Sequence, residues 1–265
     1  MSESIILQEK DHILTLTLNR PEASNAFDLP MIEKLVESLD QADRDDNVRV
    51  VIITGAGKHF CAGGDIKAMK EKREMFAGES DELRRRYQHG IQRIPLMMEK
   101  IQKPIIAAVN GAAIGAGCDF AAMADIRIGC EFTKMGETFS KLALVPGDGG
   151  TYFLPRVVGY PKAMEMFLTG KIYDSEECER MGLLNIVVTA SNLQEEAFQW
   201  AKQIASNSPM ALQMTKKALR ISYLKDLQTS LDLLSAYQGI TQRSSDHFEA
   251  LDAFNEKRSP RFTGK

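Results

Sequence analysis

The chain has 265 residues, a formal net charge of −3 at pH 7 and 44% hydrophobic residues. A chain of this size buries a substantial core, as one large domain or as one domain with an appendage. Its acidic balance argues against a nucleic-acid-binding surface, and its apolar runs are too short to span a membrane. The segment from Met1 to Ser4 lacks the basic region and apolar stretch of a targeting signal, so we expect a cytoplasmic protein.

The cysteines and histidines predict neither a metal site nor a redox site. The cysteines are far apart in the sequence, and the histidines do not have the spacing of metal ligands. We therefore expect no bound metal, and we interpret the cysteines as small buried apolar residues. The residues concerned are Cys61, Cys118, Cys130 and Cys178, and His12, His59, His89 and His247.

Apolar periodicity predicts a strand, a helix and a second strand in the first part of the chain. Residues 12–18 alternate between apolar and polar side chains, which is typical of a half-buried strand. Residues 29–42 carry apolar side chains at helical spacing, with Asp28 as the expected N-cap. Residues 48–54 form a nearly continuous apolar run, which predicts a strand covered on both faces.

The middle of the chain continues this alternation. Residues 67–86 are polar and rich in charge, and we interpret them as a solvated helix or a flexible loop. Residues 105–109 and 126–128 predict two further buried strands. Strands and helices in this order indicate an α/β layer with parallel strands and right-handed crossovers. A helical stripe precedes Pro104, which should stop it: Leu83, Tyr87, Ile91, Ile94 and Met98.

From about Tyr160 onward the pattern is mostly helical. Ser191 and Gln194 have the spacing of a capping box, and Ser208-Pro209 is expected to open another helix. A leucine stripe follows at Leu227, Leu231 and Leu234, and then a short helix around residues 248–254. We interpret residues 1–195 as a core and residues 196–265 as a helical region of the kind that often packs against other subunits.

An approximate internal repeat carries the strongest functional signal. Residues 50–55 lead into 60–65, and residues 105–111 lead into 114–119, so each time a buried strand meets a turn of Gly and Ala before a helix. Small residues allow close approach by a ligand, and the first N–H groups of a helix point outward. Two such turns on neighbouring strands can direct two N–H groups at one oxygen, as in an oxyanion hole.

The turns could also belong to a nucleotide-binding site or serve close packing alone. Gly115-x-Gly117 continues to Phe120 instead of glycine, so the dinucleotide-binding pattern fails, and no phosphate-binding P-loop is present. Close packing alone explains one such turn easily and a matched pair less well. From the residues alone, the functional interpretation and the packing interpretation both stay open.

At these residues the sequence resembles the crotonase, or enoyl-CoA hydratase/isomerase, superfamily. The resemblance covers nearly the whole chain, and it depends on the order and spacing of several motifs. They are Leu18-Asn19-Arg20-Pro21, the run from Phe60 to Lys67, Asn110-Gly111 with the turn 115–119, Ala124 to Arg127, Val145 to Gly150, Leu168 to Gly170, and Glu256 to Arg258.

The resemblance implies an α/β fold, a spiral of ββα units with a C-terminal helical trimerisation region, assembled as a homotrimer or a dimer of trimers. It implies an acyl-CoA thioester substrate, no separate cofactor, and an oxyanion hole formed by the N–H groups of Ala62 and Ala116. Lys257 would reach the nucleotide of a neighbouring subunit, unless it is only a solvated charge. The coenzyme A moiety would lie near Ala23 and along Ala62, Gly63, Gly64, Asp65 and Ile66.

Carboxylates decide which proton moves in this family. Hydratases generally use two glutamates, one after the second small-residue turn and one about twenty residues later. The first position here is Asp119, and the second falls on Phe139, which cannot transfer a proton. Glu137 is two residues out of register and is expected to point elsewhere. Asp148 offers a different partner, at a loop position that carries a working aspartate in some dienoyl-CoA isomerases and in hydrolytic aryl-CoA dehalogenases.

Each carboxylate also has a structural interpretation. Asp119 could cap the helix after its turn, and Asp148 could stabilise a turn between its glycines. Asp65 is expected to cap a helix that begins at Ile66, and Asp125 to begin a strand or a turn.

Hydration of a 2-enoyl-CoA is the leading expectation, because it is the commonest activity of the family. The alternatives are double-bond isomerisation through Asp119 and Asp148, hydrolysis with Asp148 as nucleophile, and an acyl-CoA-binding scaffold without catalysis.

Overall fold

The computed structural model describes residues 3–265, which form two sheets and the helices around them. Met1 and Ser2, part of the segment used in the targeting argument, lie outside these residues. The larger sheet has the order β1 (Ile5–Lys10), β2 (Ile13–Leu18), β3 (Val50–Gly55), β5 (Ile105–Val109), β7 (Ile126–Cys130) and β10 (Ile186–Val188). The smaller sheet has the order β4 (His59–Cys61), β6 (Ala112–Ile114), β8 (Lys134–Gly136) and β9 (Ile172–Asp174).

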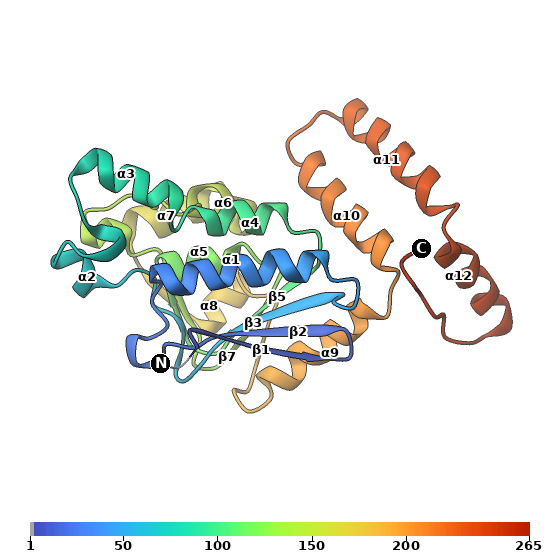
Figure 1. Cartoon of the computed structure of the whole chain (residues 1–265), viewed down its shortest axis with the longest axis horizontal. Coiled ribbons are helices and arrows are strands. Elements are labelled where there is room, and N and C mark those ends of the chain that lie inside the picture. Colours follow the sequence, from blue (N-terminus) through green and yellow to red (C-terminus); the bar gives the residue numbers. More distant parts are fainter. Residues whose placement is uncertain (1–2) are drawn as a thin grey trace.

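Helices cover the sheets and extend beyond them (Figure 1). The α-helices are α1 (Leu29–Arg44), α2 (Ile66–Lys70), α3 (Ser80–His89), α4 (Arg93–Lys100), α5 (Ala116–Ala122), α6 (Gly150–Val158), α7 (Tyr160–Thr169), α8 (Ser175–Arg180), α9 (Leu193–Ala205), α10 (Pro209–Ser222), α11 (Leu227–Thr241) and α12 (Ser245–Glu256). Short 3₁₀ helices are η1 (Pro21–Ala23), η2 (Glu74–Phe76) and η3 (Phe139–Leu142).

Strand β3 is covered on both faces, as its continuous apolar run predicts. Val51 and Ile53 pack in the core shared with α1, α4 and α5, whereas Val50 and Ile52 pack against α9 on the other face. Successive side chains of a strand point to opposite faces, so a strand between two helical layers must be apolar at every position.

The internal repeat is a structural repeat. In the first unit, β3 lies in the larger sheet, β4 lies in the smaller sheet, and α2 follows; β5, β6 and α5 repeat this arrangement. Both strand pairs of the repeat, β3 with β5 and β4 with β6, are parallel. The chain therefore winds as a spiral of ββα units, as the resemblance implies.

The structure adds one strand that no pattern predicted and refines two predicted segments. Strand β1 was missed, because only its first residue is buried and its sequence does not alternate; it pairs antiparallel with β2 through a turn at Asp11 and His12, with φ of 51° and 65°. The helical stripe before Pro104 is two helices, broken at Gly90. Residues 67–86 hold most of α2, then η2, and the first part of α3.

The capping box expected at the start of α9 is wrong. The N-cap residue is Asn192, without a side-chain cap hydrogen bond. Gln194 instead donates to Oγ1 of Thr54 at 3.0 Å, so it ties α9 to strand β3. The cap predicted at Asp28 is confirmed, because Asp28 accepts the N–H of Met31 at 2.9 Å. The helix predicted to open at Ser208-Pro209 is also confirmed: α10 begins at Pro209, although Ser208 makes no side-chain cap hydrogen bond.

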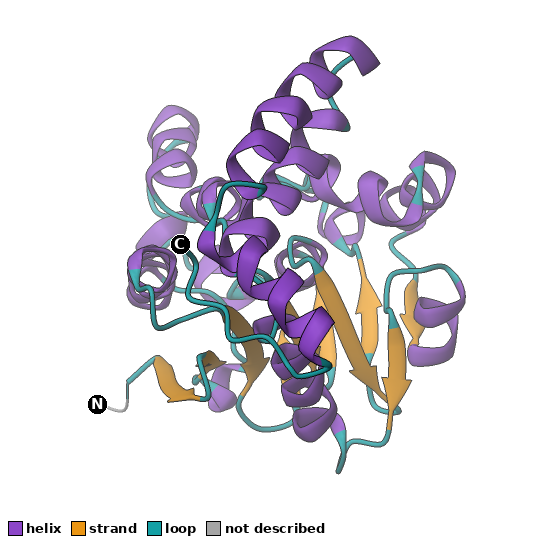
Figure 2. Cartoon of the chain, turned by 90° about the vertical axis from the view of Figure 1, so that its right-hand side faces the viewer, coloured by secondary structure: helices purple, strands orange, loops and turns teal. Residues whose placement is uncertain are grey.

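The expected boundary at residue 195 falls inside α9, which packs against the larger sheet. Helices α10, α11 and α12 form a helical layer at one end of the molecule in Figure 1. Figure 2 views the molecule from that end, with helices in front of the sheets. Helix α10 is fastened to the core by Lys216, whose Nζ donates to Asp125 Oδ2 at 2.6 Å. The division into two domains stays a prediction.

The helical layer exposes large apolar side chains, such as Leu227 at 73% and Phe254 at 83%. Apolar surface of this kind is typical of an interface between subunits. Assembly as a trimer or a dimer of trimers stays a prediction. Among the described residues, no helix has both the length and the apolar character that crossing a membrane requires.

Candidate active site

The two small-residue turns of the repeat lie against each other. Gly63 has φ of +88°, and a Cβ at this position would lie 2.6 Å from the carbonyl oxygen of Ile114 and 3.2 Å from the N of Ala116. A Cβ on Gly117 would lie 2.0 Å from the carbonyl oxygen of Cys61. Glycine is required at both positions, because a side chain would push the turns apart.

The N–H groups of Ala116 and Ala62 differ in availability. Ala116 is the first residue of α5, and its N–H has no hydrogen-bond acceptor within residues 3–265, as expected for the first N–H of a helix. The N–H of Ala62 donates to the carbonyl oxygen of Ser24 at 3.0 Å. An oxyanion hole with both donors therefore requires the Ala62 N–H to share its hydrogen bond between Ser24 and the ligand, or to break the bond to Ser24. The role of the two N–H groups as a paired oxyanion hole stays a prediction.

The segments expected to bind coenzyme A lie side by side. Ala23 ends η1, and the next residue, Ser24, accepts the hydrogen bond from Ala62. The N–H of Phe27 donates to the carbonyl oxygen of Gly63 at 2.8 Å. The loop around Ala23 is thus held against the first small-residue turn.

Asp65 has the structural role predicted for it. Its Oδ1 accepts the N–H of Ala68 at 2.9 Å, which caps α2. Ile66 is the first residue of that helix and is exposed beside the turn. Binding of coenzyme A by this segment stays a prediction.

Three buried carboxylates, hereafter the carboxylate cluster, lie next to the second turn. Asp119 lies on α5, Glu137 directly follows β8, and Asp148 lies two residues before α6. Their exposed fractions are 0%, 0% and 5%. Glu137 and Asp148 both face the Asp119 carboxyl. Both oxygens of Asp119 and of Glu137, and Oδ1 of Asp148, have no hydrogen-bond partner in the described part of the chain.

Burial raises the pKa of every member of the carboxylate cluster. The pKa of Asp119 lies well above its usual value, because burial and the charges of Glu137 and Asp148 all disfavour its ionised form. Burial raises the pKa of Glu137 to about 7 and also raises that of Asp148. Neighbouring carboxylates without a counter-ion cannot all be ionised, so the cluster holds at least one proton at neutral pH.

The expectation that Glu137 points elsewhere is wrong. Strand β8 pairs in parallel with β6, so the residue after β8 lies at the same sheet edge as the turn after β6. The N–H of Gly115 donates to the carbonyl oxygen of Gly136 at 2.8 Å, which holds Glu137 beside α5. The sequence offers one signal for this position. Glu137 directly follows β8, the strand that lies next to β6 in the smaller sheet.

The capping interpretation of Asp119 is also wrong. The N-cap of α5 is Gly115, and the Asp119 oxygens accept no backbone N–H. Phe139, at the position expected for a second glutamate, places its ring against the second turn: a Cβ on Gly115 would lie 3.7 Å from Phe139 Cζ. That position thus contributes an apolar wall, and Glu137 brings a carboxylate to the cluster from two residues earlier.

Gly150 lets α5 and α6 approach at Asp119. A Cβ on Gly150 would lie 1.7 Å from Asp119 Oδ1. We expect Gly150→Ala to displace this carboxyl, to lower the free energy of unfolding by about 1–3 kcal/mol, and to reduce kcat; thermal unfolding and steady-state kinetics measure the two effects. Gly239→Ala is the matched control, because a Cβ on Gly239 of α11 meets nothing within 4 Å. A normal kcat in folded Gly150→Ala protein would show that the position of Asp119 is unimportant.

A mainly apolar cavity of about 330 Å³ lies beside the first turn, and Lys72, Glu79 and Ser80 also line it. A Cβ on Gly64 would lie 2.4 Å from Met69 Cε, and a Cβ on Gly147 would lie 3.3 Å from Tyr87 Cε1. Burial and the charge of Asp148 raise the pKa of Tyr87, so this wall of the cavity lies near the cluster. Its apolar lining suits an acyl group: Met69, Phe76, Leu83, Tyr87 and Leu144.

Lys257 lies far from the turns within one chain. It is the C-cap residue of α12, with φ of 56°, and Figure 1 shows α12 and α2 at opposite ends of the molecule. A role of Lys257 at the nucleotide therefore requires a neighbouring subunit, and it stays a prediction.

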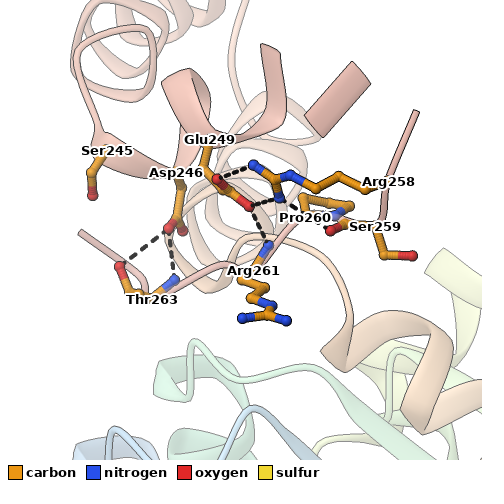
Figure 3. A pocket seen from close by; sticks show the side chains of 8 residues that line it. All are labelled: Ser245, Asp246, Glu249, Arg258, Ser259, Pro260, Arg261 and Thr263. Atoms are coloured by element: carbon orange, nitrogen blue, oxygen red, sulfur yellow. Dashed lines mark hydrogen bonds and ion pairs between the residues drawn. The ribbon is translucent and has the colours of Figure 1, made fainter. Parts of the chain in front are cut away.

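A second, polar cavity of about 830 Å³ lies where the C-terminal tail folds over α12. Figure 3 shows its carboxylates facing donors: Glu249 accepts from the Arg258 guanidinium at 2.6 Å and from the N–H of Arg261 at 2.8 Å, and Asp246 accepts the N–H of Thr263 at 2.7 Å. These paired carboxylates hold the tail, in contrast to the unpaired ones of the carboxylate cluster.

Known proteins share this arrangement along the whole chain. The family profile described as Enoyl-CoA hydratase/isomerase matches residues 8–265. A 1,2-epoxyphenylacetyl-CoA isomerase of Escherichia coli is 38% identical over 265 residues, which cover 100% of both chains. An (E)-benzylidenesuccinyl-CoA hydratase of Thauera aromatica is 36% identical and covers 98% of this chain and 99% of its own.

Solved structures agree with these relatives. A crystal structure of an enoyl-CoA hydratase from Bacillus anthracis superposes with a TM-score of 0.93 at 34% identity, over 99% of this chain and 100% of its own. The expected fold, with its helical C-terminal region, and the expected kind of enzyme are thereby confirmed. This protein belongs to the enoyl-CoA hydratase/isomerase family of the crotonase superfamily.

Proposed function

We propose that this enzyme shifts a double bond in an enoyl-CoA or dienoyl-CoA thioester, with Asp148 as base and Asp119 as acid. One observation carries the proposal: Asp119 and Asp148 are neighbours in a buried cluster, and their oxygens Asp119 Oδ1, Asp119 Oδ2 and Asp148 Oδ1 have no hydrogen-bond partner among the described residues. Burial and two neighbouring charges favour the protonated form of Asp119, whereas Asp148 is the more exposed of the two. Two carboxylates whose pKa values are separated in this way supply one acid and one base.

The chain's own groups account for each step of the reaction. The Ala116 N–H, with Ala62 if its bond to Ser24 is released, polarises the thioester carbonyl and stabilises the dienolate. Asp148 removes the α-proton, and Asp119 delivers a proton to the γ-carbon, so that the double bond moves and no water is consumed. Asp148 is then protonated and Asp119 ionised, and their mutual contact allows the proton to return to Asp119.

The apolar cavity supports the choice of substrate. Its walls at Phe76 and Tyr87 suit the apolar part of an acyl chain. The names of the relatives mention coenzyme A thioesters throughout, which supports a thioester as the substrate.

Hydration of a 2-enoyl-CoA is the second candidate. Two similar proteins named as hydratases favour it, the benzylidenesuccinyl-CoA enzyme and a 2,3-dehydroadipyl-CoA hydratase of Escherichia coli that is 35% identical. The apolar ring of Phe139 at the second turn opposes it, because addition of water is usually assisted by a carboxylate at that position.

Product analysis in heavy water separates the two reactions. We expect a 3-enoyl-CoA to be converted to the 2-enoyl isomer with deuterium at the γ-carbon, and without 3-hydroxyacyl-CoA. Incomplete deuteration is expected where the proton taken by Asp148 returns to Asp119 faster than it exchanges with solvent. Accumulation of 3-hydroxyacyl-CoA from a 2-enoyl-CoA, without double-bond migration, would instead establish the hydratase.

A further inference from the structure

We propose that Glu137 is a positioning residue that keeps Asp119 the protonated member of the carboxylate cluster. The inference rests on the proposed function, in which Asp119 is the acid. It assigns a role to a residue outside the positions at which the family resemblance implies carboxylates, which are Asp119, Asp148 and the position of Phe139.

Asp119 is the central member of the carboxylate cluster. Glu137 and Asp148 both face its carboxyl, and both disfavour its ionised form. A proton in the cluster is therefore favoured on Asp119, where it reduces the repulsion with both neighbours.

Every titratable group that faces Glu137 is acidic or a thiol. Asp119 and Cys118 face it from α5, and Asp148 faces it from the loop before α6. On the side of α8, Cys178 faces Cys118, and burial raises the pKa of both thiols, so both are neutral. Within residues 3–265, therefore, no cation balances the charge of Glu137, and no group of metal-ligating side chains has the geometry to hold a metal ion.

A glutamate that served packing alone would have partners. Asp246 is the internal comparison: it is 2% exposed, and it accepts hydrogen bonds from Ser208 Oγ and from the N–H groups of Thr263 and Gly264 at 2.7–3.0 Å. Glu137 is 0% exposed, and its oxygens accept no backbone N–H or hydroxyl within the described residues; outside the carboxylate cluster only the weakly donating thiol of Cys118 faces it there. Burying an unpaired carboxylate is costly, so its retention beside Asp119 points to a role in the chemistry.

The role follows from the repulsion between carboxylates. A negative charge on Glu137 disfavours the ionised form of Asp119 and accepts its hydrogen bond when Asp119 is protonated. Without that charge, the pKa of Asp119 falls toward that of Asp148. Acid and base then lose their separation, and less of the enzyme carries a proton on Asp119 at neutral pH.

Glu137→Gln tests this inference, because it keeps the shape of the side chain and removes its charge. In the pH dependence of kcat/KM, the basic limb reports loss of the proton from Asp119. A lower pKa means that this proton is lost at a lower pH. We expect the basic limb to move down by about one pH unit or more, while the acidic limb, set by Asp148, moves much less. Glu33→Gln, on the exposed face of α1, is the matched control and should leave both limbs in place.

Infrared spectroscopy measures the same proton without turnover. The band of the protonated Asp119 carboxyl, identified by its loss in Asp119→Asn protein, should titrate at a lower pH in Glu137→Gln. Glu137→Asp keeps the charge and should restore most of the wild-type profile. It also provides the test if the glutamine variant does not fold.

The outcomes separate the inference from the proposed function. A lower rate with both limbs and the infrared titration unchanged would reduce Glu137 to a packing residue and overturn the inference alone. Normal turnover by folded Asp119→Asn protein would overturn the proposed function, whatever Glu137 does.

Discussion

Asp119→Asn is expected to lower kcat by about 10² or more, because it removes the principal acid of the carboxylate cluster. Asparagine has nearly the same shape, so the contact between α5 and α6 at Gly150 is kept. Steady-state kinetics with an enoyl-CoA measures the effect. Acyl-CoA binding and thermal unfolding must first show that the variant is folded and occupied.

Asp148→Asn distinguishes isomerisation from hydration, both of which require Asp119. If both acids transfer protons, this change should be as damaging as Asp119→Asn; if Asp119 alone assists water addition, its effect should be mild. Asp46→Asn, an exposed residue after α1, is the control and should be silent. Full activity in Asp119→Asn protein would contradict isomerisation and hydration together, and would reopen the hydrolytic and scaffold interpretations.

Ala116→Pro is expected to lower kcat by about 10²–10³, since it removes the N–H donor at the start of α5 that is proposed to bind the oxyanion. Proline is well tolerated at the first position of a helix, where Ala116 lies, so the fold should survive. The rate loss should appear in kcat more than in KM, because the donor acts on charge that develops in the transition state.

Ala116→Gly is the matched control, because it keeps the N–H and changes only the methyl group. Its kcat should remain close to that of the wild type. Ala62→Pro removes the second donor together with its hydrogen bond to Ser24. Its effect therefore combines a loss of oxyanion stabilisation with the loss of a contact that holds the loop around Ala23. Normal turnover by folded Ala116→Pro protein would show that this N–H does not carry the oxyanion.

Much of the fold could be predicted from local patterns. The buried strand β5 (Ile105–Val109) was predicted with its bounds, because a run of five apolar residues is typical of a strand that is covered on both faces. The turns at Ala62 and Ala116 could be located because only small residues allow the chain to approach itself so closely. Strand β1 could not be predicted in this way: it is an edge strand, and its register depends on pairing with β2.

The sequence by itself determined the strands, turns and helices of the repeat, and with them the place of Asp119, which is three residues from Ala116 in the same helix. Only the tertiary structure decided which carboxylates surround it. Glu137 and Asp148 come from separate segments that meet because β8 extends the smaller sheet and α6 packs on α5 through Gly150. Burial without a counter-ion, which raises the pKa of Asp119, arises from that assembly. A charge pattern along one segment cannot reveal it, because each carboxylate taken alone is compatible with an exposed surface residue.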